Sequence, residues 1–228
     1  MTLSILCVTR AEPHAIRFLR EMTALGAQIN AEVVFAADGA EAMRALWDEI
    51  NWRVYAVKSR GYIESVLDEA VGFCRGDYIL RLDDDERCSP AMVRWLEARS
   101  YVAADHWKFP RANLWPTAEH VALTPQLWPD HQTRLSVRAK AGGRSTIHAG
   151  SPFGGGEEAP CVIEHHKFLV KPLEERRAIV ARYDRIAANM GTAFLAFSCP
   201  EDAYPDGLAV GSLGDGTASR VVADRKVA

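Results

Sequence analysis

Short apolar runs of strand length alternate with amphipathic stretches through the first hundred residues of the chain. The spacing predicts strands at Ser4–Thr9, Glu32–Ala37, Arg53–Val57 and Asp77–Leu82. Helices are predicted between these strands, and another after Ser89 and Pro90, which suit an N-cap and a first helical position. This alternation is typical of an α/β domain with a mainly parallel central sheet flanked by helices.

The pattern changes after about residue 104, where short candidate strands are separated by loops rich in Pro, Trp and Gly. The 228 residues suit one large domain, which we divide into residues 1–104, residues 105–192 and a tail of residues 193–228. A helix is predicted over Pro172–Met190, with an apolar face that points inward. That face comprises Leu173, Ile179, Val180, Tyr183, Ile186 and Ala187. The small residues from Gly207 onward predict a loosely attached tail.

Composition excludes several classes of protein. Hydrophobic residues make up 48% and charged residues 25%, which excludes wholesale disorder. A net charge of -3 argues against nucleic acid as a partner. The five cysteines contain no C-x-x-C pair, so the sequence predicts a cytoplasmic protein without a disulfide framework. Because no apolar run reaches about 18 residues, we expect no membrane span, while peripheral membrane association stays open.

An acidic run, Asp83–Asp84–Asp85–Glu86, follows the fourth predicted strand directly. Ligands of open α/β sheets bind at the carboxyl ends of the strands, where this run lies. Adjacent carboxylates in a cleft repel one another unless a cation neutralises them, and such hard oxygen ligands suit Mg²⁺ or Mn²⁺. The alternative is a solvated acidic turn that caps the next helix, but the position after an apolar strand favours the ion.

Several motifs, in this order, resemble those of the family 2 glycosyltransferases of GT-A fold. They are SILCVTR, AADG, CRGDYILRLDDDE, WPDHQTRL and EHHK, and they span roughly residues 2–190. The resemblance implies a single GT-A (Rossmann-like) domain that moves a sugar from a nucleoside-diphosphate sugar, UDP-sugar first, to an acceptor hydroxyl, with inversion. Residues 1–104 would then bind the nucleotide sugar, and residues 105–192 would bind the acceptor and close the site. The acceptor would be a saccharide, a lipid-linked group or another hydroxyl compound.

The resemblance also implies roles for individual residues. Asp83 and Asp85 match the metal-binding aspartates, and Asp83 and Asp84 also match donor contacts. The other positions that match the donor-binding region are Thr9, Arg10, Asp38 and Arg60. From the sequence alone, Asp38 is equally suited to cap the helix that follows Gly39.

An inverting transfer needs a general base close to the acceptor hydroxyl. Asp130, in WPDHQTRL, is the first candidate, and Glu157 or Glu158 is the second, with Glu158 preferred. If the run at His165 and His166 is a strand, only one imidazole can point to the site. We expect His166 to be the third metal ligand.

Three other functions remain open at this point. A nucleotidyltransferase would also use acidic metal ligands, although the TRAEPH segment lacks the basic, Gly-rich loop expected after its first strand. A metal-dependent phosphoester or diphosphate hydrolase could use Asp83, Asp85 and one of the two histidines. A non-catalytic module would bind the nucleotide sugar and transfer nothing.

Overall fold

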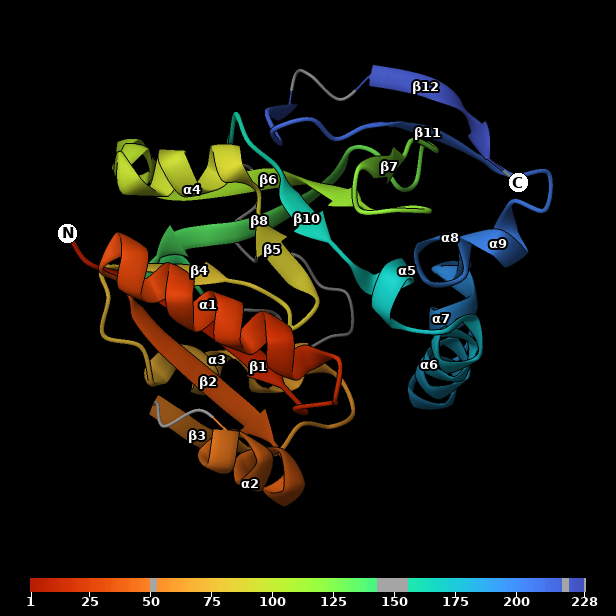
Figure 1. Cartoon of the computed structure of the whole chain (residues 1–228). Coiled ribbons are helices and arrows are strands. Elements are labelled where there is room, and N and C mark those ends of the chain that lie inside the picture. Colours follow the sequence, from red (N-terminus) through yellow and green to blue (C-terminus); the bar gives the residue numbers. More distant parts are fainter. Residues whose placement is uncertain (50–52, 143–155, 219–221, 228) are drawn as a thin grey trace.

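The computed structural model of this chain describes residues 1–49, 53–142, 156–218 and 222–227, and Figure 1 shows their arrangement. The strands are β1 (Leu3–Thr9), β2 (Glu32–Asp38), β3 (Arg53–Val57), β4 (Tyr78–Arg81), β5 (Glu86–Cys88), β6 (His106–Asn113), β7 (His120–Ala122), β8 (Asp130–Val137), β9 (Glu157–Glu158), β10 (Ile163–His165), β11 (Leu208–Ser212) and β12 (Val222–Val227). The helices are α1 (Ala15–Ile29), α2 (Ala40–Glu49), α3 (Leu67–Gly72), α4 (Pro90–Glu97), α5 (Lys167–Val170), α6 (Leu173–Ile186), α7 (Met190–Ala193), α8 (Leu195–Ser198) and α9 (Pro200–Ala203).

The larger sheet has the strand order β3-β2-β1-β4-β8-β6-β10-β5, with β9 beside β6. The first four strands in this order are parallel to one another. β8 joins them in antiparallel orientation, β6 is antiparallel to β8, and β10 is parallel to β6. The predicted α/β fold with a mainly parallel central sheet flanked by helices is confirmed.

Both faces of β1 are covered, as its unbroken apolar sequence predicts. Ile5 and Cys7 pack on one face with residues of α1, α2 and α4. Leu6 and Val8 pack on the other face with α3. Side chains alternate between the two faces of a strand, so a single apolar run fills two core layers. The carboxyl end of β1 is thereby fixed, and Thr9 with it.

The tail is not loosely attached in its described part, which corrects the sequence prediction. β11 pairs with β7 on one side and β12 on the other, forming a second, antiparallel sheet. Leu208, Val210 and Leu213 are buried, and Leu213 packs with residues of β6 and β7. The backbone oxygen of Asp215 also accepts from the first turn of α4. Small residues are found both in mobile tails and in closely packed strands, so composition alone could not predict which of the two this segment forms.

The attachment of β11 predicts a large loss of stability when a charge enters it. Val210 is fully buried opposite Ala122 of β7, so Val210→Asp is expected to lower the free energy of unfolding by at least about 3 kcal/mol. Ser212→Asp is the matched control, because Ser212 is exposed on the same strand. Thermal or urea unfolding measures both. Equal stabilities of the two variants would show that this strand is not part of the core.

α6 begins close to the predicted residue, but its inward face differs from the prediction. Arg176 is its buried residue, whereas Ile186 is 39% exposed. The guanidinium group of Arg176 donates to the backbone oxygen of Ser198 at 3.0 Å and to Glu201 at 2.8 Å, which explains how it is buried. Ile179 and Tyr183 instead line a cavity. No helix of the described residues is long and apolar enough to cross a membrane.

Candidate functional site

A cavity of about 360 Å³ opens at the carboxyl ends of β1, β2 and β4. Thr9, Asp38 and the three consecutive aspartates line it from the parallel half of the sheet. Strands β6, β8 and β10 contribute further residues, and α6 with the segment from Phe194 to Ser198 forms another wall. In Figure 1 the group α5 to α9 lies to one side of the main sheet. The first and second parts of the chain therefore both build this cavity.

The acidic run forms a tight turn at the end of β4. The backbone amide of Leu82 still donates to Leu6 of β1 at 3.0 Å, and that of Glu86 closes the turn onto the Asp83 oxygen at 3.0 Å. Asp85 is buried and Glu86 is fully buried. The turn thus directs the three aspartates toward the cavity while Glu86 enters the interior as the first residue of β5.

Two arginines, the buried Arg134 and the partly buried Arg111, neutralise part of this acidity. Arg134 of β8 pairs with Asp83 and also with Glu86, the second pair at 2.6 Å. Arg111 of β6 pairs with Glu86 at 3.2 Å and with Asp130 at 2.6 Å. Burial opposes the charge of Arg111, but Asp130 and Glu86 raise its pKa. Asp83 and Glu86 therefore have cationic partners within the protein itself.

Asp85 lies at the centre of the remaining contacts. Its Oδ2 atom is 3.0 Å from Nζ of Lys171, and its Oδ1 atom is 3.4 Å from Nε2 of His165. Burial disfavours the carboxylate, yet the charge of Lys171 outweighs burial and holds the pKa of Asp85 well below its ordinary value. Asp85 is thus a buried carboxylate that stays ionised at neutral pH.

The tautomer of His165 follows from its second contact. Nδ1 of the ring lies 2.7 Å from Oδ1 of Asn113, whose amide nitrogen donates to the Leu127 oxygen at 2.9 Å. Because the amide oxygen accepts, Nδ1 carries the hydrogen and Nε2 presents a lone pair in the neutral ring. Burial and Arg111 lower the pKa of His165 to about 4. The lone pairs of Nε2 and of Asp85 Oδ1 therefore face each other, which favours a cation between them.

The preference for His166 over His165 is corrected by this geometry. The imidazole of His166 lies 3.4 Å from Glu164 and makes an edge contact with the ring of Phe18 in α1. Only the backbone amide of His166 reaches the acidic run, donating to the Asp85 oxygen at 2.8 Å. β10 ends at His165, and His166 follows it outside the strand as the residue before α5, so the alternation expected of a strand does not apply to this pair.

Thr9 and Asp84 meet across the first and fourth strands. The Thr9 hydroxyl donates to Oδ2 of Asp84 at 2.6 Å and accepts from the backbone amide of Ala11 at 2.9 Å. Burial raises the pKa of Asp84 to about 6. Both residues line the cavity, so both are in reach of a ligand bound there.

Asp38 lies at the end of β2 and is held by three donors. The Ser59 backbone amide and hydroxyl donate to it at 2.8 and 2.5 Å, and Nε of Arg10 donates at 3.1 Å. Burial opposes its charge, but the two hydrogen bonds from Ser59 and the contact with Arg10 lower the pKa of Asp38. Its carboxylate can still accept at the cavity wall.

Three other predicted site residues, Arg60, Glu158 and Asp130, do not share one place in the structure. Within the described part of the chain, Arg60 and Glu158 do not line the cavity. The Glu158 side chain is 62% exposed and pairs with Lys108 at 3.1 Å. Asp130 does line the cavity, but Arg111 and Gln132 occupy both of its oxygens. Of the predicted bases Asp130, Glu157 and Glu158, only Asp130 lines this cavity among the described residues.

Apart from Arg10, the basic residues that line the cavity were not predicted from the sequence; among them are Arg111, Arg134, Lys167 and Lys171. Lys167 and Lys171 stand four residues apart after the histidine pair, a spacing that places both on one side of a helical turn. Arg111 and Arg134 stand in short strand-like runs, where a buried cation implies an acidic partner. The lysine spacing and the arginines within strand-like runs are the sequence signals from which these four residues could have been predicted.

The paired state of Asp130 predicts an acid-sensitive contribution to stability. Burial disfavours its charge, but Arg111 and Gln132 lower its pKa in the folded protein. Its stabilisation is therefore present above the unfolded-state pKa of about 3.9 and is lost as the pH falls through the folded value.

Asp130→Asn is accordingly expected to be less stable than wild type by about 3 kcal/mol at pH 6, with the difference shrinking toward pH 3. Urea unfolding at a series of pH values measures this. A difference that does not change with pH would contradict the pairing.

No protein-family model and no curated protein matches this sequence. Among solved structures, S. aureus TarS 1–349, a GT-A family 2 glycosyltransferase, is similar over 87% of this chain and 73% of its own, with 14% identity and a TM-score of 0.49. A CMP:2-keto-3-deoxy-manno-octonic acid synthetase complexed with CTP is similar over 61% of this chain and 75% of its own, with 13% identity and a TM-score of 0.41. The bifunctional IspDF from Campylobacter jejuni is similar over 61% of this chain and 42% of its own, with 8% identity and a TM-score of 0.40. These likenesses concern the fold alone.

Proposed function

We propose that this chain is a metal-dependent glycosyltransferase that moves a sugar from a nucleoside-diphosphate sugar to an acceptor hydroxyl with inversion. The observation that carries the proposal is the position of Asp85 Oδ1 and His165 Nε2, which lie 3.4 Å apart in the cavity. A carboxylate and a neutral imidazole in this arrangement suit a divalent cation, and the nitrogen favours Mn²⁺ over Mg²⁺. The motif resemblance of the sequence supports the same reaction.

Asp85 and His165 would hold the ion, and Asp83 and Asp84 would contact its waters or the donor. A divalent ion there supplies positive charge to the leaving diphosphate. Lys171, whose ammonium group is 3.0 Å from Asp85, adds a second positive charge on the same side. Asp38, Arg10 and Thr9 line the part of the cavity that we assign to the nucleotide, with uracil as the first base to test.

In the transfer, the acceptor oxygen forms a bond to the anomeric carbon as the bond from that carbon to the diphosphate oxygen breaks. The diphosphate leaves with the electron pair, and the hydroxyl proton passes to a carboxylate base. We keep Asp130 as the proposed base, because it lines the cavity. Its two hydrogen-bonded oxygens lower its basicity, so the bound acceptor must displace Gln132 or Arg111 from one of them.

The acceptor class remains a proposal: a saccharide, a lipid-linked group or another hydroxyl compound. All five cysteines are free, and four of them are buried. Free thiols are the usual state in a reducing compartment, which supports the proposed cytoplasmic location.

A calorimetric panel of nucleoside-diphosphate sugars, with and without Mn²⁺, tests the proposal. At least one donor is expected to bind only with the ion present, and then to be hydrolysed slowly without acceptor. Glu158→Gln is the control and should bind the donor like wild type, since this exposed residue lies off the cavity. Preference for a nucleoside triphosphate would favour a nucleotidyltransferase, and phosphoester cleavage without any sugar donor a hydrolase. Donor binding without turnover would leave a binding module.

A further inference from the structure

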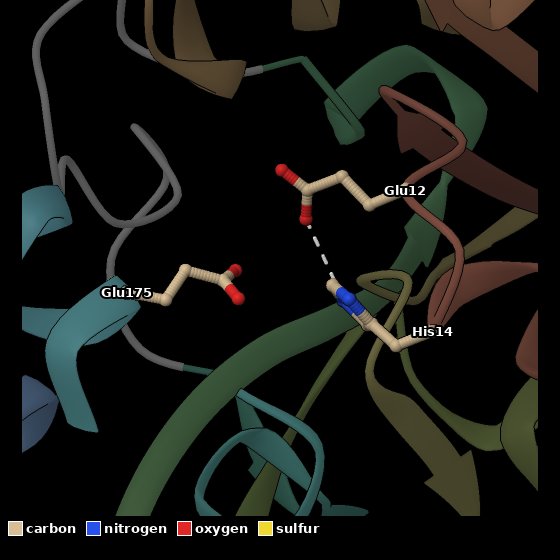
Figure 2. A group of neighbouring side chains, drawn as sticks. All are labelled: Glu12, His14 and Glu175. Carbon is tan, nitrogen blue, oxygen red and sulfur yellow. Dashed lines mark ion pairs between the residues drawn. The ribbon is translucent and has the colours of Figure 1, made fainter. Parts of the chain in front are cut away.

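Three potential metal ligands meet at the edge of the cavity, outside the acidic run. Glu12 and His14 lie in the loop between β1 and α1, and Glu175 lies in the first turn of α6. Figure 2 shows the three side chains directed toward a common point. One ligand atom from each lies within 4.8 Å of the others. Residues that are far apart in the sequence thus converge here.

The loop itself is held in place. The backbone amide of Ala15 donates to the Glu12 oxygen at 2.8 Å, so Glu12 and His14 lie in one tight turn that leads into α1. The His14 side chain is 15% exposed and makes no capping hydrogen bond to the helix. The imidazole is thus positioned by the turn and by packing, while capping of α1 does not need it.

Nε2 of His14 is a buried nitrogen that has no hydrogen-bond partner among the described residues. It lies 3.5 Å from Oε2 of Glu12, an ion pair only if the imidazole is protonated, as the dashed line in Figure 2 marks. A buried polar nitrogen without a partner is unfavourable, and native proteins satisfy such groups with protein, water or an ion. The unpartnered nitrogen therefore suits a ligand bound between His14 and the two glutamates.

We propose that Glu12, His14 and Glu175 bind a divalent transition-metal ion of the Zn²⁺ type. Imidazole nitrogen and carboxylate oxygens are the ligands that Zn²⁺ takes in proteins, at about 2.0–2.2 Å, which places tetrahedral ligand atoms roughly 3.4 Å apart. The ligand atoms now lie within 4.8 Å of one another, and rotation of the long glutamate side chains can bring them to the shorter spacing that the ion needs. Two carboxylates balance the charge of the ion, and a water molecule completes four ligands.

The ion would join the loop after β1 to α6. Glu12 lines the cavity, as do Ile179, Arg182 and Tyr183 of α6. Lys171, the nearby cation, is paired with Asp85 at 3.0 Å, so its charge is matched by the acidic run. The proposed ion therefore links α6, which forms one wall of the cavity, to the loop that follows β1. Its ligands are different residues from Asp85 and His165, the proposed ligands of the other ion.

Zn²⁺ titration by calorimetry into the full chain carrying His165→Ala tests this site, because that background removes the imidazole of the other one. One equivalent of Zn²⁺ is expected to bind. Adding His14→Ala or Glu175→Gln is expected to weaken this binding at least about 100-fold, since even supporting residues around a metal change affinity 10- to 100-fold. Co²⁺ in place of Zn²⁺ should show visible absorption bands that His14→Ala abolishes.

Glu174→Gln is the matched control, because it removes the same charge one residue away in the same helical turn. It should bind Zn²⁺ like its parent. Thermal unfolding without metal checks that each variant is folded. If His14→Ala is not folded, Glu175→Gln is used for the binding test instead. Unchanged Zn²⁺ affinity and stoichiometry in the folded variants would overturn the proposal. That result would leave the Mn²⁺-dependent donor binding proposed above unaffected, so the two failures are distinguishable.

Discussion

Asp85→Asn is expected to weaken Mn²⁺-dependent binding of the nucleoside-diphosphate sugar at least about 100-fold, more than the loss of a residue that only supports a metal ligand. The amide keeps the shape of the carboxylate but removes its charge. It therefore leaves a neutral amide beside His165 and removes the anion that holds Lys171. Calorimetric titration of the donor, with and without Mn²⁺, measures the change.

Lys171→Met separates the two cationic contributions at Asp85. If the metal dominates, this variant should keep Mn²⁺-dependent binding with reduced affinity, whereas Asp85→Asn should lose the dependence altogether. Circular dichroism and thermal unfolding must show that both variants are folded, since Asp85 is buried. Donor affinity in Asp85→Asn that still rises with Mn²⁺ as in wild type would refute the assignment of Asp85.

The role of the acidic run changes once its partners are known. The sequence argument held that three adjacent aspartates need a divalent cation to offset their repulsion. In the structure, Arg134 pairs with Asp83, the Thr9 hydroxyl donates to Asp84, and Lys171 pairs with Asp85. Repulsion alone therefore does not require a metal. The support for one comes instead from His165, whose Nε2 atom lies 3.4 Å from Asp85 in the cavity.

The parallel half of the fold could be predicted from the sequence because its signals are local. β1, β2 and β3 are apolar runs, and a helix lies between each of them and the next. β4 ends one residue before the predicted Leu82. Parallel strands in register bring their carboxyl ends to one edge, so the proximity of Thr9, Asp38 and Asp84 follows from the strand assignment alone. The cavity was predictable to that extent.

The second half could not be predicted in the same way, because its contacts depend on which strands pair. Arg111 and Arg134 reach the acidic run only because β8 lies between β4 and β6. Choosing between His165 and His166 requires knowing that β10 ends at His165 and that Asn113 stands opposite it in β6. In the tail, alternating Leu208 and Val210 form a strand whose partner, β7, is only three residues long. The residues of one strand do not show which other strand will pair with it, so these contacts could not be predicted from the sequence.

Arg111→Met is expected to lower the free energy of unfolding at pH 7 by about 3–5 kcal/mol, the loss typical of breaking a buried ion pair from one side. Arg111 contacts two carboxylates, Asp130 and the fully buried Glu86. Methionine fills a similar volume, so the loss reflects the two acids left without this partner. Urea unfolding followed by circular dichroism measures it.

Arg177→Met is the control, because Arg177 is about half exposed and also contacts two acids, Glu174 and Asp202. Screening by water limits the expected loss there to about 1 kcal/mol or less. In Arg111→Met the folded-state pKa values of Asp130 and Glu86 rise, so the destabilisation should be largest at neutral pH and shrink as acid protonates them. A loss no greater than that of Arg177→Met, at any pH, would mean that Arg134 alone compensates Glu86, and that the pair of Arg111 with Asp130 adds little to stability.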